Sequence, residues 1–298
     1  MNSVLEFIGV ERAYKQGVPV LDGITFSMAA GEVAGLLGRN GAGKTTLIRI
    51  AMGMLKPQAG RVRVFGLDPA RDAVEIKRRI GFVAEDQVLP GWARVQDLID
   101  FHRYLFPRWD EALERQLAER FGLRRGEKIK NLSKGQARQV ALLLAVCHRP
   151  ELLVLDEPAG GLDPVVRREF LETSIELLNR EGTAILFSSH HMGDVERLAG
   201  RVVLLDGGKV RIDSDLDQLR ERHCVALVSK GSVSSAAVLE EMPGCLRART
   251  QGESWHAVFA GDPAEVEQRI RQGLGSNGVR CSRVPLEELF IEFVGAQQ

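Results

Sequence analysis

Residues 38–46 read Gly38-Arg39-Asn40-Gly41-Ala42-Gly43-Lys44-Thr45-Thr46, and this stretch decides the fold. It follows the apolar run Val33–Leu37 and precedes a helical pattern, which is the context that a phosphate-binding P-loop needs. Its glycines let backbone N–H groups wrap phosphates at a helix N-terminus. Lys44 is expected to reach the β and γ phosphates of a nucleotide, and the Thr45 hydroxyl to bind Mg²⁺. The predicted phosphate-binding residues are Gly38, Asn40, Gly41, Gly43, Lys44, Thr45 and Thr46.

Two acidic residues follow another apolar run. Leu152–Leu155 is a predicted buried strand, and Asp156 and Glu157 come directly after it. Carboxylates buried at a strand end are costly unless a cation or a reacting water uses them. Asp156 suits Mg²⁺, and Glu157 suits a general base. With the P-loop, these acids predict a nucleoside triphosphatase of no particular class.

The wider pattern predicts an α/β domain followed by a smaller one. The apolar runs are continuous rather than alternating, which is typical of parallel strands buried on both faces. Between about residues 86 and 146 helical periods replace them, so an all-helical insert is expected. From His223 onward the order βαββαβ plus a helix indicates a small ferredoxin-like α+β unit. The predicted domains are 1–222, with a helical subdomain at about 86–146, and 223–298. The predicted parallel strands are Val33–Leu37, Ile80–Ala84, Leu152–Leu155, Ala184–Phe187 and Val202–Leu205.

Composition excludes several classes of protein. With 298 residues and 44% hydrophobic content, the chain is not expected to be disordered, and 40 Lys and Arg against 40 Asp and Glu give no basic footprint for nucleic acid. The longest strictly apolar run, Val140–Cys147, is far short of the roughly 20 residues that cross a bilayer. No secretion signal opens the sequence, so a cytoplasmic protein is expected. The four cysteines lie far apart, without the spacing of a zinc knuckle or a disulfide scaffold.

The segment Leu132-Ser133-Lys134-Gly135-Gln136, about twenty residues before the acids, narrows the class. With the P-loop and the acids in this order, residues from about Val4 to Leu219 resemble the ATP-binding cassette (ABC) family, of which this signature is the most specific mark. The resemblance implies a P-loop ABC ATPase fold that uses ATP and Mg²⁺ as a pair of cassettes. It implies that Ser133, Gly135 and Gln136 face the γ-phosphate of an ATP bound by the other subunit.

The same resemblance implies roles for three further residues. Tyr14 stands where the family has an aromatic residue that stacks on adenine, although a lone tyrosine after a strand is also a common packing residue. Gly161-Leu162-Asp163 is similar to the loop that joins the two subunits across the nucleotide. His190 resembles the switch histidine that contacts the γ-phosphate, whereas an isolated histidine is usually structural.

Three positions depart from the family pattern. Glu85 stands where a glutamine usually links Mg²⁺ to the membrane subunit, so a metal role is expected for Glu85 beside Thr45 and Asp156. Lys134 replaces a common glycine in the signature, and Gly160 replaces a common serine. Neither change removes a backbone donor, so activity is expected. The tail at residues 285–294 resembles that of ABC-2-type exporter ATPases, although a helix that closes a small domain explains its apolar spacing equally well.

These features predict the ATP-hydrolysing subunit of an ABC transporter, more an exporter than an importer. Its expected partners are a membrane permease on a separate chain and a second ABC subunit, identical or different, with no nucleic acid. It is expected at the inner face of the cell membrane. A soluble ABC ATPase acting on ribosomes or DNA is the alternative, but the single cassette, the lack of heptads and the neutral charge argue against it. A regulatory subunit that binds ATP without hydrolysing it is a third possibility, and Glu157 and His190 argue against that.

Overall fold

A computed structural model describes residues 3–15, 17–179, 182–275 and 278–295. It divides into two compact units, Met1–Asp213 and Ser214–Gln298, called unit 1 and unit 2 below. Among the residues described, no helix combines the length and the apolar character needed to cross a membrane.

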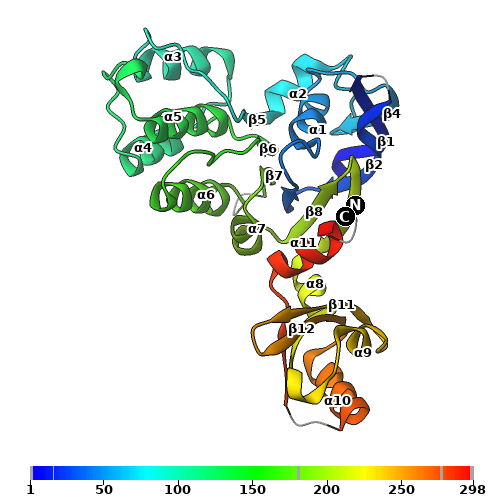
Figure 1. The fold of residues 1–298 in the computed structure, drawn as a ribbon. Helices are drawn as coiled ribbons and strands as arrows, with labels where there is room; N and C mark the ends of the chain where they lie inside the picture. The colour runs from blue at the N-terminus through cyan, green and yellow to red at the C-terminus, as the bar shows by residue number, and fades with distance from the viewer. Residues whose placement is uncertain (1–2, 16, 180–181, 276–277, 296–298) are drawn as a thin grey trace. The chain divides into compact units, whose positions relative to one another are not determined.

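A six-stranded sheet forms the centre of unit 1 (Figure 1). Its order is β5-β6-β7-β3-β8-β9, and the pairs from β5 to β8 are parallel. The five predicted apolar runs are strands of this sheet, which confirms the α/β prediction. Because β3 lies between β7 and β8, the P-loop leaves from the middle of the sheet. The strands are β3 (Val33–Leu37), β5 (Ile80–Val83), β6 (Leu152–Leu155), β7 (Ala184–Ser189), β8 (Arg201–Asp206) and β9 (Lys209–Asp215).

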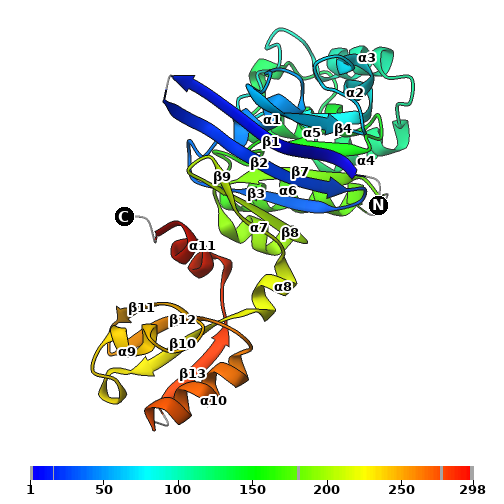
Figure 2. The same cartoon turned by 90° about the vertical axis from the view of Figure 1, so that its right-hand side faces the viewer.

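A second, antiparallel sheet in unit 1 was not predicted. It has the order β2-β1-β4, with β1 at Ser3–Lys15, β2 at Val18–Ala29 and β4 at Ala59–Val64 (Figure 2). Toward the end of β2, buried and exposed residues alternate, as in a strand with one face on the core. The buried side chains of β1, β2 and β4 join those of the helix after the P-loop and of the six-stranded sheet in one core cluster.

Helices complete unit 1, and the segment 86–146 is helical as predicted (Figure 1). Within it, the buried Glu114 carboxylate accepts from Arg103 and Trp109 at 2.7 Å each and pairs with Arg125 at 2.7 Å. This ion cluster joins Arg103, Glu114 and Arg125, which come from three successive parts of the segment. The helices of unit 1 are α1 (Lys44–Ala51), α2 (Ala73–Arg79), α3 (Val95–Leu105), α4 (Glu111–Arg120), the 3-10 turn η1 (Ile129–Asn131), α5 (Lys134–Val146), α6 (Pro164–Asn179) and α7 (Met192–Leu198).

Unit 2 has the βαββαβ order expected of a ferredoxin-like domain. Its sheet order is β11-β12-β10-β13 with antiparallel neighbours, and its core brings Phe259 of the sheet together with Leu239, Val266 and Ile270 of the helices. The division after Asp213 precedes the predicted boundary at Arg222, because α8 packs against β10. The elements are α8 (Leu216–Glu221), β10 (His223–Ser229), η2 (Lys230–Ser232), α9 (Ala236–Glu240), β11 (Cys245–Gln251), β12 (Ser254–Ala260), α10 (Pro263–Leu274), β13 (Val279–Arg283) and α11 (Leu286–Gly295).

Candidate nucleotide site

The P-loop joins β3 to α1 through glycines that the backbone requires. Gly43 has φ 100°, and a Cβ there would lie 2.8 Å from the carbonyl oxygen of Val20. At Gly38 a Cβ would lie 2.6 Å from the carbonyl oxygen of Leu205. Side chains at these positions would force the loop away from its neighbours. Glycine at both positions therefore allows the tight loop conformation. The backbone N–H groups in the first turn of α1, which have no partner within the helix, face the P-loop.

A cavity of about 460 Å³ opens over this loop. Most of the predicted phosphate-binding residues line it, and so does Glu157, which comes from the end of a different strand. The structure therefore brings together residues that are far apart in the sequence. The cavity is lined by Tyr14, Val20, Arg39, Asn40, Gly41, Ala42, Gly43, Lys44, Thr45, Thr46, Glu85 and Glu157.

Asp156 is held at the end of β6 by two hydroxyl groups. The Ser188 Oγ donates to Asp156 Oδ1 at 2.7 Å, and the Thr45 side chain hydrogen-bonds the same carboxyl group. Burial raises the pKa of Asp156, the negative charge of Glu157 raises it further, and the two hydroxyl hydrogen bonds oppose this rise. Thr45 and Asp156, both predicted as metal ligands, are thus neighbours.

Glu157 lies at the centre of the charged groups. Its Oε1 is 3.2 Å from Lys44 Nζ, and its Oε2 is 2.8 Å from His190 Nδ1. The Glu157 side chain is buried, whereas that of His190 is 39% exposed. Lys44 Nζ also donates to the carbonyl oxygen of Gly38 at 2.8 Å. A carboxylate in this position can accept a proton while a cation and an imidazole stand beside it.

Glu85 adds a third carboxylate beside Asp156 and Glu157. Burial raises the pKa of Glu85, and the negative charges of Asp156, Asp86 and Glu157 add to the rise. In the described residues no three His, Cys, Asp or Glu side chains converge into a metal site of their own. Mg²⁺ usually takes one or two carboxylates together with substrate phosphates. The mutual repulsion of these carboxylates, with the Thr45 hydroxyl on Asp156, fits such a cation.

Tyr14 lies at the rim of the cavity on β1. The residue is 57% exposed, its hydroxyl lies 3.3 Å from Thr46 Oγ1, and the Arg12 guanidinium stands 5.4 Å from the ring centre. A residue of the core would be buried, so this exposure argues against a role for Tyr14 in core packing.

The signature residues occupy a separate place in unit 1. Ser133 is the N-cap of α5, where its Oγ accepts from Gln136 N at 3.1 Å and Gln136 Oε1 accepts from Ser133 N at 3.0 Å. Asp163 lies directly before α6, and its Oδ1 accepts from Val166 N at 3.1 Å. Within the part of the chain that the structure describes, Ser133, Gly135, Gln136 and Asp163 do not line the P-loop cavity.

Two residues of the site lay outside the sequence prediction. Ser188 accepts from Glu157 N at 2.8 Å while it donates to Asp156, so one hydroxyl orders both acids. Arg138 of α5 is buried and contacts the backbone beside Glu85 and Glu157. The position of Ser188 at the end of an apolar strand was the available signal for it, whereas no motif singled out Arg138.

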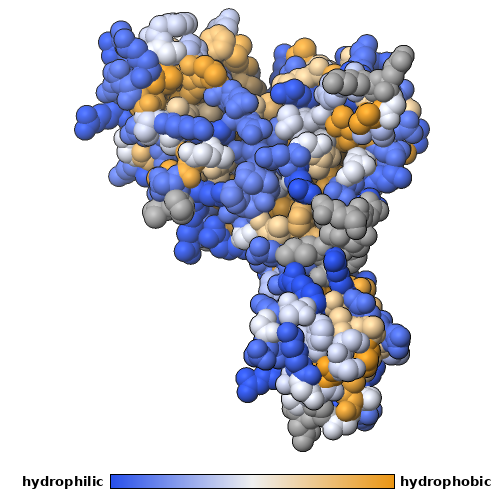
Figure 3. Space-filling model, viewed as in Figure 1, coloured by the Kyte–Doolittle hydropathy of each residue, from blue (hydrophilic) through white to orange (hydrophobic). Residues whose placement is uncertain are grey.

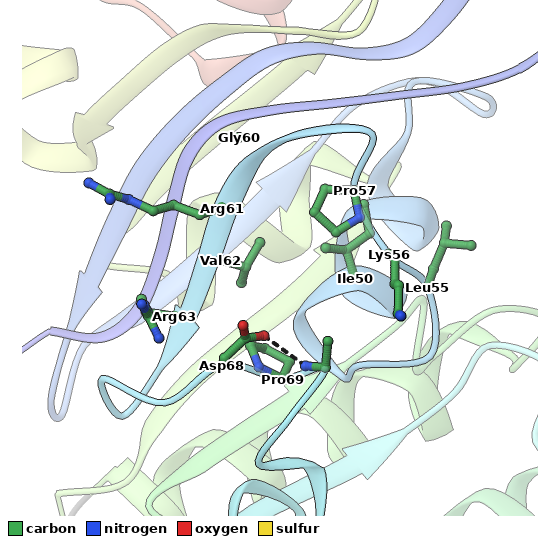
Figure 4. Close-up of a pocket in the computed structure, with 11 residues that line it drawn as sticks. Ile50, Leu55, Lys56, Pro57, Gly60, Arg61, Val62, Arg63, Asp68 and Pro69 are labelled. Carbon is green, nitrogen blue, oxygen red and sulfur yellow. Dashed lines mark hydrogen bonds between the residues drawn. The ribbon is translucent and has the colours of Figure 1, made fainter.

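A second cavity, of about 250 Å³, lies between the end of α1 and β4 (Figure 4). Ile50, Val62 and Pro69 give it an apolar lining. The carboxylate of Asp68, which also lines this cavity, accepts from Ala70 N at 2.9 Å and so stabilises the local turn at residues 68–70. These groups offer no acid–base pair comparable with Glu157 and His190.

Comparison with known proteins agrees with this geometry. A family model described as ABC transporter matches residues 21–160. The daunorubicin resistance ATP-binding protein DrrA3 of Streptomyces coeruleorubidus is 31% identical over 301 residues, covering 96% of this chain and 94% of that protein. The Nod factor export ATP-binding protein I of Mesorhizobium japonicum is 32% identical over 302 residues, which cover 98% of this chain and 87% of that protein.

A solved structure described as the ATP binding subunit of an ABC transporter is similar as well. It has 28% sequence identity and a TM-score of 0.66, and the match covers 73% of this chain and 92% of that one. The two relatives extend the similarity over nearly the whole chain. The chain belongs to the ABC transporter family, as one of its ATP-binding and ATP-hydrolysing subunits.

Proposed function

We propose that the P-loop cavity binds Mg-ATP and that Glu157 is the general base of its hydrolysis. The observation that carries this proposal is the contact of Glu157 with Lys44 at 3.2 Å and His190 at 2.8 Å in a cavity built on the P-loop. Glu157 accepts the proton of the attacking water. Lys44 holds the phosphates, and His190 orients the carboxylate and contacts the γ-phosphate.

The proposed metal ligands are Thr45 and Asp156, with Glu85 beside them. Bound there, Mg²⁺ would neutralise phosphate oxygens and orient them. Ser188 keeps the Asp156 carboxylate in place by donating to Oδ1 at 2.7 Å. Glu85 adds negative charge at the cavity wall, which would favour a divalent cation over a monovalent one.

A second cassette, of the same or another chain, would complete the site. The Ser133 hydroxyl already accepts the Gln136 N–H, and its own proton is free to meet a phosphate oxygen. Lys134 and Gly135 occupy the first turn of α5, where backbone N–H groups lack partners within the helix. We place Ser133, Gly135, Gln136 and Asp163 of each chain against the ATP held by the other.

The proposed membrane partner is a permease on a separate chain. Exposed apolar and aromatic side chains occur in the segment after Glu85 and along α3, and Figure 3 shows apolar residues at the surface of this part of unit 1. Such a patch is typical of a protein interface. A partner seated there would act on the loop that carries Glu85. By analogy with the Nod factor export relative, we propose export and a place at the inner face of the membrane. The exposed residues are Val88, Trp92, Phe101, Tyr104 and Leu105.

The catalytic proposal is tested by Glu157→Gln in the full chain. The amide keeps the shape but has no carboxylate to accept a proton, so phosphate release should fall by about 10²–10⁴-fold while Mg-ATP still binds. ATP retained between two cassettes should increase the dimer fraction in size-exclusion chromatography. The matched control is Glu151→Gln, at the other end of the same strand, where the side chain pairs with Arg79 at 2.6 Å.

Glu151→Gln should hydrolyse ATP at the native rate. Native turnover by Glu157→Gln would show that another group is the base. Loss of ATP binding in folded Glu157→Gln would show that Glu157 is chiefly a ligand or a structural support.

A further inference from the structure

The backbone of Glu157 has a conformation that side-chain-bearing residues rarely adopt. Its φ is 43°, in the left-handed region, where Cβ crowds the backbone. Such a residue keeps this conformation only if its surroundings hold it. The direction of the Glu157 carboxylate depends on this backbone, so the contacts that hold it bear on catalysis.

Neighbouring groups hold both sides of the Glu157 residue. Its N–H donates to Ser188 Oγ at 2.8 Å, and its carbonyl oxygen accepts from Gly160 N at 3.0 Å. Arg138 Nη1 approaches the same carbonyl at 3.5 Å and donates to the carbonyl of Pro158 at 3.2 Å. One guanidinium therefore contacts two successive carbonyls directly after Asp156.

The same guanidinium reaches the loop at the other wall of the cavity. Arg138 Nη2 donates to the carbonyl of Glu85, and Nη1 lies 3.4 Å from the carbonyl of Ala84. The Arg138 side chain is buried, and a buried cation is costly unless acceptors surround it. Four backbone carbonyls from two segments meet that need, and the planar guanidinium can serve both segments at once.

Arg138 stands on the helix that begins with the signature. Ser133 caps α5, and Arg138 follows within its first two turns. Lys134, in the first turn of the same helix, places its side chain against Gly161, where an added Cβ would meet Nζ. The helix α5 therefore contacts the segment after Glu157 at a second point. A shift of α5 would therefore pull on the backbone of Glu157.

We propose that Arg138 is a positioning residue that fixes the backbone of Glu157 from the signature helix of the same chain and ties it to the Glu85 loop. This inference rests on the proposed role of Glu157 as the base. Arg138 thereby connects the ATP site of its own chain with the helix that serves the ATP of the second cassette. It acts through Glu157 and does not itself touch the nucleotide.

The test compares Arg138→Met and Arg138→Lys with native full-length chain. Methionine fills the space without donors, so kcat should fall between about 10- and 100-fold while KM and nucleotide affinity stay near native values. Lysine keeps the charge but cannot span both segments, and its kcat should lie between those of methionine and arginine. The matched control, Arg149→Met, removes another guanidinium beyond the end of α5, where Arg149 pairs with Asp110 at 2.6 Å, and it should keep native kcat.

A double variant distinguishes this inference from the proposed function. If Arg138 acts through Glu157, adding Arg138→Met to Glu157→Gln should cost little further turnover. The inference would be overturned if the fold-loss of kcat in the double variant equalled the product of the two single fold-losses. Native kcat in folded Arg138→Met would overturn it as well, and either result would leave Glu157 as the base. Native turnover by Glu157→Gln alone would instead refute the proposed function.

Thermal unfolding shows which variants are folded. If Arg138→Met does not fold, Arg138→Lys decides the question. A several-fold loss of kcat at native KM supports the role, and native kcat contradicts it.

Discussion

The parallel sheet of unit 1 and the antiparallel sheet of unit 2 use their strand ends differently. In unit 1, the carboxyl ends of β3, β6 and β7 lie at one edge, and the P-loop, Asp156 and His190 follow these strands. In unit 2, strands that are adjacent in the sheet run in opposite directions, so their carboxyl ends lie at opposite edges. The relative direction of the strands, more than the size of the sheet, therefore decides where reactive groups lie together. Substitutions in unit 2 should therefore change the stability of unit 2 and leave nucleotide binding unchanged.

The largest expected effect tests the independence of unit 2. Phe259 is fully buried in the core of this unit, so Phe259→Ala should lower its free energy of unfolding by about 3–5 kcal/mol. ATP affinity and the unfolding of unit 1 should not change. Denaturant unfolding, followed in parallel with nucleotide binding, measures both. If ATP affinity falls with the stability of unit 2, the two units are coupled and the comparison fails.

A shortened chain is the control for this prediction. A chain that ends at Asp215, the last residue of β9, keeps the whole six-stranded sheet and loses unit 2. It should bind ATP as the full chain does. Loss of binding in a folded shortened chain would assign unit 2 a part in the site.

The next prediction compares one buried histidine from each unit. His148 stacks on Phe106 with ring centres 4.2 Å apart, and burial, with a smaller effect from the charge of His102, lowers its pKa to about 4. Burial also lowers the pKa of His256 in unit 2, but Glu288, whose Oε1 lies 3.8 Å from its Nε2, opposes the shift. Unit 1 should therefore respond to acid more strongly through its histidine than unit 2.

Folded His148 binds a proton less readily than unfolded histidine, whose pKa is about 6.5, so its contribution is present above that pH and is lost as pH falls toward 4. Between pH 7 and pH 5 unit 1 should lose about 2 kcal/mol through this residue. His148→Gln should reduce that loss, as measured by unfolding at both pH values. An equal loss in the variant would show that other groups dominate.

The last prediction asks whether Tyr14 on β1 adds a contact to a nucleotide site that is otherwise built at the ends of the parallel strands. Tyr14 is exposed at the cavity, and stacking of a ring on a base is worth about 1–3 kcal/mol. Tyr14→Ala should weaken ATP binding several-fold or more, whereas Tyr14→Trp should keep most of it. Tyr14→Phe is the control for the hydroxyl that lies 3.3 Å from Thr46 Oγ1. Equal affinities for native, alanine and tryptophan forms would assign Tyr14 to packing alone.

The sequence predicted the parts of the fold that repeat a simple pattern. Continuous apolar runs such as Leu152–Leu155 indicate a strand buried on both faces, and the structure places that run in the parallel sheet. The antiparallel sheet of β1, β2 and β4 was missed, because its strands bury one face and several register shifts break the alternation in β1. The end of unit 1 at Asp213 depends on the packing of α8 against β10, which no local pattern reports.

In the candidate site, too, some residues could be predicted from the sequence and others could not. Motifs indicated Lys44, Asp156 and Glu157 because their chemistry needs those residue types at those positions. Ser188 and Arg138 act through the Glu157 backbone N–H and through backbone carbonyls, respectively, and such partners depend on the folded path of the chain rather than on sequence spacing. Their roles therefore required the structure.

The central position of β3 in the six-stranded sheet also matters while the chain is being synthesised on the ribosome. Its neighbours β7 and β8 begin only at Ala184 and Arg201, so a nascent chain that has completed the P-loop still carries a strand with two open edges. At about 5–20 residues per second, the ribosome needs roughly ten to thirty seconds to supply both partners. During that interval the apolar β3 is exposed to mispairing with other chains. Unit 2, whose four strands follow one another within a short stretch, closes its sheet soon after it emerges.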